Sequence, residues 1–309
     1  MANARTVLPT DLPALVSYDG RVYANEAVTL DRLGTEASPH PIETALEQWL
    51  SFATGRHTCV SVKGATLRGL VSARKRGSKQ AWEIDCLIDA SDGDTSVILS
   101  LLDRIVDAAG RSGALKVFLR LRDDSVAREP ACRAGFQPYR RETVYRRAIS
   151  PGDPPRAPDR LRRRAKADHY PIFQLYTQLV PAEVRRLEGM TFEEWLAAQE
   201  SLGRTAQYVL PHDGRIAGWL RLAGDGDLGR FDLVGDGGVL DALIDGALTK
   251  LANRKTAIAA VPEHQPLLAQ RLAARGFDAG ESYVIMARRT VRPIKSRVKV
   301  PAVAQTTFG

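Results

Sequence analysis

The hydrophobic and polar positions of this chain follow one pattern that occurs twice. The first copy begins with the alternating run Trp82–Ile88, passes through an Asp/Gly loop into an amphipathic helix, and reaches the apolar run Val117–Leu119. The second copy repeats this order from Gly229–Val234, through a Gly/Asp loop and a helix, to Ile258–Val261. An order of elements that recurs at a nearly constant offset indicates two domains of one fold.

The repeat is most regular in the predicted helices. The apolar positions of the first helix recur 142 residues later in the second, where Ile98, Leu101, Leu102 and Ile105 correspond to Leu240, Leu243, Ile244 and Ala247. The pair Gly135-Phe136 recurs 141 residues later as Gly276-Phe277. Each pair is followed by a strand-like run, Thr143–Tyr145 in the first copy and Tyr283–Met286 in the second.

Hairpins are predicted ahead of both copies. His57–Val62 is expected to pair with Leu67–Ala73, and Gln207–Leu210 with Ile216–Leu222, because each pair of strand-like runs flanks a turn that contains glycine. Each half then reads as a strand, two helical regions, antiparallel strands, and alternating strands and helices. This order predicts an α/β (α+β) fold, in which two tandem domains each hold a mixed, mostly antiparallel sheet flanked by helices.

Length and composition agree with two globular domains. The 309 residues suffice for two average domains, and 44% apolar and 26% charged residues are typical of a folded globular chain. We expect an N-terminal domain over 1–150, a Pro/Arg-rich linker over 151–163, a C-terminal domain over 164–290 and a basic extended tail over 291–309. The start of the chain has no signal-peptide pattern, and no apolar stretch approaches membrane-spanning length, so we expect a cytoplasmic protein without membrane contact. The scattered histidines and three cysteines have no metal-ligand spacing, and no metal site is predicted.

The net charge of +8 is concentrated in two places. One is the linker, and the other is the tail, where Arg292, Lys295, Arg297 and Lys299 occur without any acidic residue. Runs of this kind can attract an anionic partner such as a phosphate backbone, or they can simply be solvated. We expect the tail to be extended, because it contains Pro293 and Pro301 and ends in small polar residues.

Each half resembles the GNAT acyl-CoA-dependent N-acetyltransferases, and the whole chain resembles tandem GNAT proteins such as mycothiol synthase in length and layout. The residues that carry the resemblance are Thr10–Leu15 at the first strand-to-helix turn, the two Gly-Phe pairs and the closing strand Tyr283–Arg288. The resemblance spans nearly everything from Arg5 to Arg289. It implies an acyl group donated by acetyl-CoA or another acyl-CoA, and an acceptor that is a small-molecule or peptide amine.

The resemblance also places the cofactor loop after the fourth strand of each half, where backbone amides at a helix start bind the pyrophosphate. In the first half this stretch, 89–96, keeps one glycine and carries several carboxylates, and Asp94 or Thr95 can cap the helix instead. The second half is richer in glycine and less acidic. We therefore expect the cofactor, if either half binds it, to contact Leu233, Val234, Gly235, Gly237 and Gly238.

Two carboxylates are candidates for the base that deprotonates the amine. The resemblance implies a glutamate on the fourth strand, and Glu83 lies on that strand in the first half, while Asp232 is the only carboxylate in the matching strand of the second half. The tyrosine that family members use as a proton donor is replaced by Ala131 in one half and by Leu272 in the other. The sequence thus predicts an N-acetyltransferase whose first domain is degenerate, and the alternative is a non-catalytic GNAT-fold module that binds a ligand or a partner.

Overall fold

The computed structural model describes residues 4–6, 23–35, 56–64, 66–91, 93–150 and 157–290. The first half of the chain contains six strands, two α-helices and a 3-10 turn among these residues. In chain order they are β1 (Ala4–Thr6), η2 (Leu30–Arg32), β2 (His57–Lys63), β3 (Thr66–Lys75), β4 (Ala81–Asp89), α4 (Thr95–Arg111), β5 (Lys116–Arg122), α5 (Arg128–Arg133) and β6 (Gln137–Ala148).

The second half repeats this order after a short strand, a 3-10 turn and three helices. Its elements are β7 (Arg162–Arg163), η3 (Lys166–Asp168), α6 (His169–Leu179), α7 (Ala182–Glu188), α8 (Phe192–Ala198), β8 (Thr205–His212), β9 (Arg215–Asp225), β10 (Leu228–Gly235), α9 (Leu240–Lys250), β11 (Thr256–Pro262), α10 (Pro266–Ala273) and β12 (Asp278–Arg289).

All twelve strands join one sheet in the order β1-β2-β3-β4-β5-β12-β6-β11-β10-β9-β8-β7. Only the pairs β4–β5 and β10–β11 are parallel, and the other neighbours are antiparallel. The predicted hairpins are present as β2–β3 and β8–β9. The predicted fold class, a mixed and mostly antiparallel sheet flanked by helices, is confirmed.

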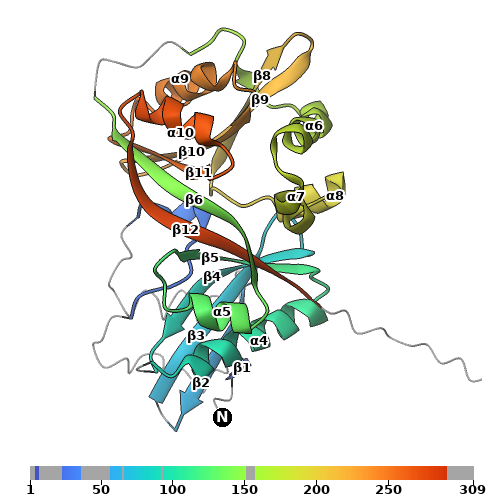
Figure 1. Cartoon of the computed structure of the whole chain (residues 1–309), viewed down its shortest axis with the longest axis vertical. Helices are drawn as coiled ribbons and strands as arrows, with labels where there is room; N and C mark the ends of the chain where they lie inside the picture. Colours follow the sequence, from blue (N-terminus) through green and yellow to red (C-terminus); the bar gives the residue numbers. More distant parts are fainter. Residues whose placement is uncertain are drawn as a thin grey trace, which may run out of the picture.

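The two halves exchange their last strands (Figure 1). β12 lies between β5 and β6, and β6 in turn pairs with β11 of the second half. Val284 and Met286, near the end of the chain, are therefore buried in the core beneath α4, while Tyr145 of β6 packs against the core of the second half. The halves are thus interlocked through the middle of the sheet. The expected domain boundaries stay a prediction, and the turn at 10–15 lies outside the described residues.

The helices form where the repeat predicted them. Ile98, Leu101 and Leu102 of α4 and Leu243 and Ile244 of α9 are almost fully buried against the sheet. Burying an aliphatic side chain of this size contributes about 1.5–3 kcal/mol, so these faces hold the helices in place. In the second half α9 and α10 cover one face of the sheet, and α6, α7 and α8 cover the other. None of the helices within the described ranges is long and apolar enough to cross a bilayer.

Candidate active site

The two parallel strands of the second half separate before they end. β10 and β11 pair through four residues each, the last of which are Phe231 and Ala259. Beyond them β10 continues along β9 to Gly235, and β11 continues along β6 to Pro262. Among the described residues, the edge of β10 that faces β11 has no strand partner from Asp232 onward. Ligands in sheets with parallel strands typically bind at such openings beyond the carboxyl ends.

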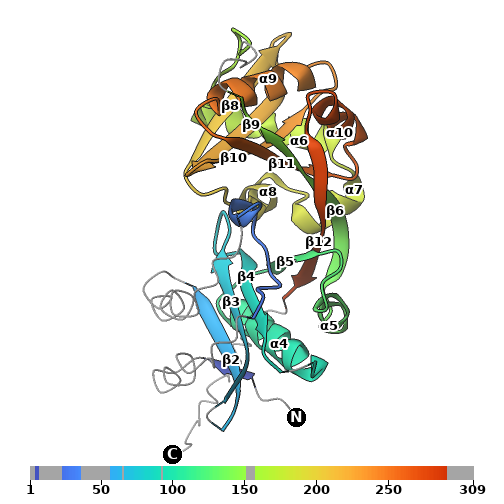
Figure 2. The ribbon, with the colours of Figure 1, turned by 90° about the vertical axis from the view of Figure 1, so that its left-hand side faces the viewer.

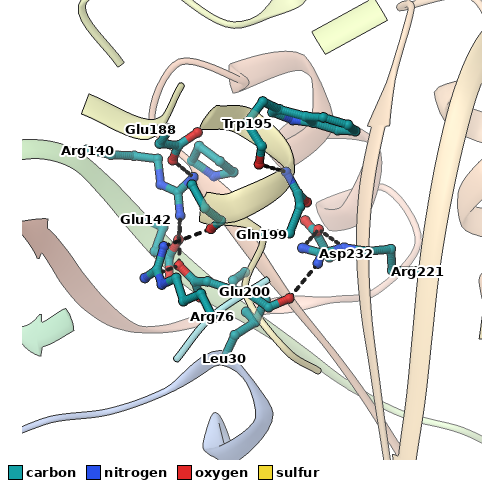
Figure 3. A pocket seen from close by; sticks show the side chains of 13 residues that line it. Leu30, Arg76, Arg140, Glu142, Glu188, Trp195, Gln199, Glu200, Arg221 and Asp232 are labelled. Carbon is teal, nitrogen blue, oxygen red and sulfur yellow. Dashed lines mark hydrogen bonds and ion pairs between the residues drawn. The ribbon is translucent and has the colours of Figure 1, made fainter. Parts of the chain in front are cut away.

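A pocket of about 70 Å³ lies at this opening, where the two halves meet (Figure 3). The first half supplies residues from η2, β6 and the turn after β3, and the second half supplies β9, β10, β11, α7, α8 and the residues that follow α8. Its charged lining consists of Arg76, Arg140, Arg221, Glu142, Glu188, Glu200 and Asp232. Since both halves build the walls, the pocket depends on the contact between them.

Glu200 is the centre of a buried ion-pair network along one wall of the pocket. It accepts hydrogen bonds from Arg76 at 2.9 Å and from Arg120 at 2.7 Å, and Arg120 also donates to Glu142 at 2.6 Å. The Glu200 and Arg120 side chains are only 7% and 2% exposed. Burial opposes the charge on Glu200, but Arg120, Arg76 and Arg140 outweigh it and lower the pKa of this carboxyl well below its usual range. The wall is therefore a fixed array of ionised groups.

The opposite wall offers hydrogen-bond acceptors (Figure 3). Asp232 receives two hydrogen bonds from Arg221, both at Oδ2, and no described residue donates to its Oδ1. Gln199 donates its amide nitrogen to the Trp195 carbonyl at 3.1 Å, which leaves its side-chain oxygen as an acceptor. Acceptors of this kind favour a ligand that donates, such as an ammonium group.

The structure places the two predicted catalytic carboxylates differently. Asp232 lines the pocket, as described above. Glu83 lies on the part of β4 that is still paired with β5, and its oxygens accept hydrogen bonds from Arg74 at 2.6 Å and from Arg76 at 3.1 Å. Its side chain is 4% exposed and does not line the pocket. Glu83 therefore belongs to the ion-pair network that supports the pocket wall.

The predicted cofactor residues of the second half lie together at the same opening. Leu233, Val234 and Gly235 form the end of β10, which pairs with β9 but not with β11, and Gly237 and Gly238 form the turn into α9. No side chain caps the start of α9. A Cβ at Gly238 would meet nothing within 4 Å, so the turn is open on that side. Amides at an uncapped helix start, next to an open glycine turn, suit a bound phosphate.

The corresponding helix of the first half is closed by its own side chains. Asp94 caps α4 by accepting a hydrogen bond from the Ser96 amide at 3.1 Å. Arg68 pairs with Asp94 at 3.0 Å, which occupies the basic group nearest to this turn. The predicted cap at Asp94 is therefore present, whereas Asp92 lies outside the described residues. A capped helix start with a carboxylate in place is a poor site for an anion.

The opening between β4 and β5 is also filled by the chain itself. Residues 25–28, here called the plug segment, bridge to both strands, through Asn25 to Ile88 and through Ala27 to Leu121. The Glu26 amide donates to the Leu87 carbonyl at 2.8 Å, and the Val28 amide donates to the Arg120 carbonyl at 3.0 Å. Figure 2 shows this blue segment and η2 running beside β4 toward the second half. An extended ligand has no free strand edge to join there.

The side chain of Asn25 completes the plug segment. Its oxygen accepts hydrogen bonds from the Leu87 amide at 2.8 Å and from the Ala27 amide at 3.0 Å, and its nitrogen donates to the Asp85 carbonyl at 3.2 Å. The amide thus imitates a further piece of strand on the edge of β4. Sequence reasoning missed this segment, because residues 23–35 contain no alternating run.

Sequence reasoning also missed the charged walls of the pocket. A signal was available, since Arg120 and Arg221 each interrupt an otherwise apolar strand, as in Phe118-Leu119-Arg120-Leu121. A charge in the middle of a buried strand requires a partner and often marks a functional site. The two positions that lack the expected tyrosine, Ala131 and Leu272, are fully buried in the two cores.

Comparison with known proteins gives the fold but not the activity. No protein-family model and no curated protein matches the sequence. The structure is similar to a GCN5-related N-acetyltransferase from Sphaerobacter thermophilus, with 18% identity, coverage of 94% of this chain and 97% of the other, and a TM-score of 0.53. It is also similar to a tandem GNAT protein from the clavulanic acid biosynthesis pathway, with 15% identity, coverage of 95% and 100%, and a TM-score of 0.52.

A third similar structure is the N-myristoyltransferase of Saccharomyces cerevisiae with bound myristoyl-CoA and inhibitors, at 14% identity, coverage of 95% of this chain and 82% of the other, and a TM-score of 0.51. The likeness to mycothiol synthase stays a resemblance of length and layout. The sheet order, the repeated halves and the near-complete coverage of these structures lead to one conclusion: the chain has the GNAT fold, in the tandem arrangement of two halves.

Proposed function

We propose that this protein is an acyl-CoA-dependent N-acyltransferase that works through its second half. One observation supports this most directly. No strand among the described residues occupies the opening between β10 and β11, which adjoins a charged pocket, whereas the matching opening between β4 and β5 is filled by the plug segment. The chain would then hold one acyl-CoA, and the first half would serve to complete the pocket.

The acyl-CoA would lie along β10 and at the start of α9. The unpaired edge at Leu233, Val234 and Gly235 is available to an extended ligand, and Gly237 and Gly238 leave room for a pyrophosphate at the uncapped helix start. Asp236 is the only acid in this turn, and Arg215 pairs with it at 3.2 Å, which offsets its charge. The bound thioester would supply an acyl group that is activated for transfer.

The acceptor amine would enter the pocket between the halves. Asp232 Oδ1 and the Gln199 side-chain oxygen are acceptors for its ammonium group. The Arg76–Glu200–Arg120 wall would hold these residues in position without competing for the amine, because its charges are already paired. Of the two predicted catalytic carboxylates, only Asp232 is kept in this proposal, as the group that holds the acceptor.

A second candidate function is a binding module that holds acyl-CoA without transferring the acyl group. The observation that favours it is the absence of a proton-donating side chain at Ala131 and Leu272. Both candidates require the same acyl-CoA site, so that binding and transfer must be measured separately.

Calorimetric titration of the full chain with acetyl-CoA tests the shared part of both candidates. We expect one binding site per chain. When acetyl-CoA is in hundredfold excess over its Kd, the free energy of unfolding of the protein should rise by about 2.7 kcal/mol. Gly238→Asp places a carboxylate at the helix start in open space and should abolish binding, because the phosphate would meet a negative charge. Asn253→Asp, in the exposed turn after α9, adds the same charge, and this variant should bind acetyl-CoA normally.

Thiol release from acetyl-CoA in the presence of a panel of amines then separates the two candidates. Amine-dependent release would support the transferase. Binding with no release for any amine would favour the binding module. An absence of binding at millimolar acetyl-CoA would exclude both.

A further inference from the structure

Several buried polar atoms without a partner gather beside the pocket. Among the described residues, the Tyr139 hydroxyl, Arg140 Nε and both ring nitrogens of His264 are buried and make no hydrogen bond. All three side chains interact electrostatically with Glu188, and Glu188 and Arg140 line the pocket. More than about nine in ten buried polar groups in native proteins have a partner. A concentration of exceptions at one place indicates a site that water or a ligand completes.

His264 occupies a distinctive position in this group. It follows the separated end of β11, where Pro262 lines the pocket, and the Gln265 amide donates to the Pro262 carbonyl at 2.9 Å as the chain turns into α10. On the other side of this loop, Leu267 approaches the glycine turn, since a Cβ at Gly237 would lie 3.0 Å from it. His264 therefore lies in the segment that joins β11, whose Pro262 lines the pocket, to α10, whose Leu267 approaches the proposed acyl-CoA turn.

The surroundings of His264 favour the neutral form of its imidazole. Burial has the largest effect and lowers the pKa of His264, and the Arg140 guanidinium on β6 acts in the same direction. Glu188 and Glu183 on α7 and Glu263 in the same loop act in the opposite direction but do not outweigh them. A neutral imidazole has a free lone pair and can accept a proton near neutral pH. Asp232 is less suited to this task, because Arg221 already donates twice to its Oδ2.

We propose that His264 is the proton-transfer residue of this site and accepts the proton that the acceptor ammonium must lose. The proposal rests on the proposed function. The imidazole would receive the proton through water in the pocket, whose volume of about 70 Å³ has room for such water. The freed amine nitrogen then bonds to the thioester carbonyl carbon, the carbon–sulfur bond breaks, and the departing thiolate takes the second amine proton. The imidazolium returns its proton to solvent, so that one amide, one thiol and one proton are formed.

The first test is a pH profile of acetyl-CoA-dependent thiol release with the best amine of the panel, for the wild type and for His264→Gln. We expect kcat for His264→Gln to fall by about 10²–10⁴-fold and to lose the decline that the wild type shows toward acid pH. The Kd for acetyl-CoA should not change, because His264 is not part of the glycine turn. His212→Gln, at the exposed end of β8, is the matched control and should keep the wild-type profile.

The second test does not depend on turnover. Proton NMR follows the titration of each histidine, and the His264 resonance is assigned from its absence in His264→Gln. We expect it to titrate below the ordinary value of about 6.5 and to shift when acetyl-CoA is added. A wild-type pH profile for His264→Gln would overturn the proposal. A His264 resonance that titrates at the ordinary value and does not change when acetyl-CoA is added would overturn it as well. A wild type that transfers nothing to any amine would instead overturn the proposed function.

Discussion

Glu200 of the second half accepts a hydrogen bond from Arg76 of the first half at 2.9 Å, and both side chains are almost fully buried. Glu200 follows α8, and Arg76 follows β3. This ion pair therefore joins the second-half segment that lines the pocket to the first half. Arg76 also donates to the Ala198 carbonyl at 3.2 Å, at the end of α8. The shape of the pocket thus depends on a contact between residues that lie far apart in the sequence.

Glu200→Gln should destabilise the protein by about 3–5 kcal/mol at pH 7, because it breaks two buried ion pairs and leaves Arg76 with Glu83 and Arg120 with Glu142 as their remaining buried partners. The pKa of Glu200 is lowered in the folded state from an ordinary value of 4.5. Its stabilising contribution is therefore fully present above that value and is lost as pH falls below it. Denaturant unfolding at pH 7 and at pH 3 should show that the difference in the free energy of unfolding between wild type and variant is smaller at the lower pH.

The control for Glu200→Gln is Glu129→Gln, which removes an exposed pair with Arg133. We expect a change of less than about 0.5 kcal/mol for this substitution, because exposed pairs contribute little. A Glu200 variant as stable as the control would show that the network does not hold the halves together.

Gly77→Ala should disturb the same contact through the backbone. A Cβ at Gly77 would lie 2.2 Å from the Leu196 carbonyl oxygen of α8, a distance that requires the helix to move. We expect the free energy of unfolding to fall by about 1–3 kcal/mol, as is typical of an overpacked site. Any ligand in the pocket should also bind more weakly. Gly280→Ala on β12 is the matched control, since its Cβ would make an ordinary contact at 3.4 Å. Equal thermal midpoints for the two variants would contradict the close approach of α8.

Asn25→Ala should loosen the plug segment without opening an acyl-CoA site. The substitution removes the oxygen that accepts hydrogen bonds from the Leu87 and Ala27 amides. We expect this loss to lower the free energy of unfolding by about 1–3 kcal/mol. Hydrogen exchange at the Leu87 amide should accelerate. The amide hydrogen bonds of Glu26 and Val28 remain, so the acetyl-CoA stoichiometry should stay at one per chain. The exposed Asn253→Ala is the control, and a second bound acetyl-CoA in Asn25→Ala would show that the plug alone closes the first half.

The repeated pattern predicted the fold because α4 and α9 carry the same buried positions, such as Leu101 and Leu243, ahead of the same Gly-Phe pairs. The exchange of β6 and β12 was beyond sequence reasoning. Both strands carry similar apolar and charged positions, and either could pair within its own half, so the local pattern does not distinguish the two arrangements. Only the packing of the complete sheet decides between them.

Some residues of the candidate site could likewise be predicted from the sequence, and others could not. Asp232 could be located in advance, because it is the one carboxylate in its strand. The pairing of Arg76, Glu200 and Arg120 could not, because it joins residues from three separate elements with no fixed spacing. His264 lacked any motif, and its interest comes only from its buried, unpartnered nitrogens and its place between β11 and α10.

The basic tail stays a predicted contact for an anionic partner and lies outside the described residues. The tail begins after Thr290, whose amide donates a hydrogen bond to the Leu115 carbonyl at 3.0 Å directly after the end of β12. A chain that ends at Thr290 should therefore keep its fold and lose Arg292, Lys295, Arg297 and Lys299. On heparin and on generic RNA we expect the full chain to be retained more strongly at low salt. The difference should shrink steeply toward physiological salt, because the release of counterions from the phosphates becomes less favourable as the salt concentration rises. Equal retention of the two forms, with equal thermal midpoints, would show that the tail does not bind anions.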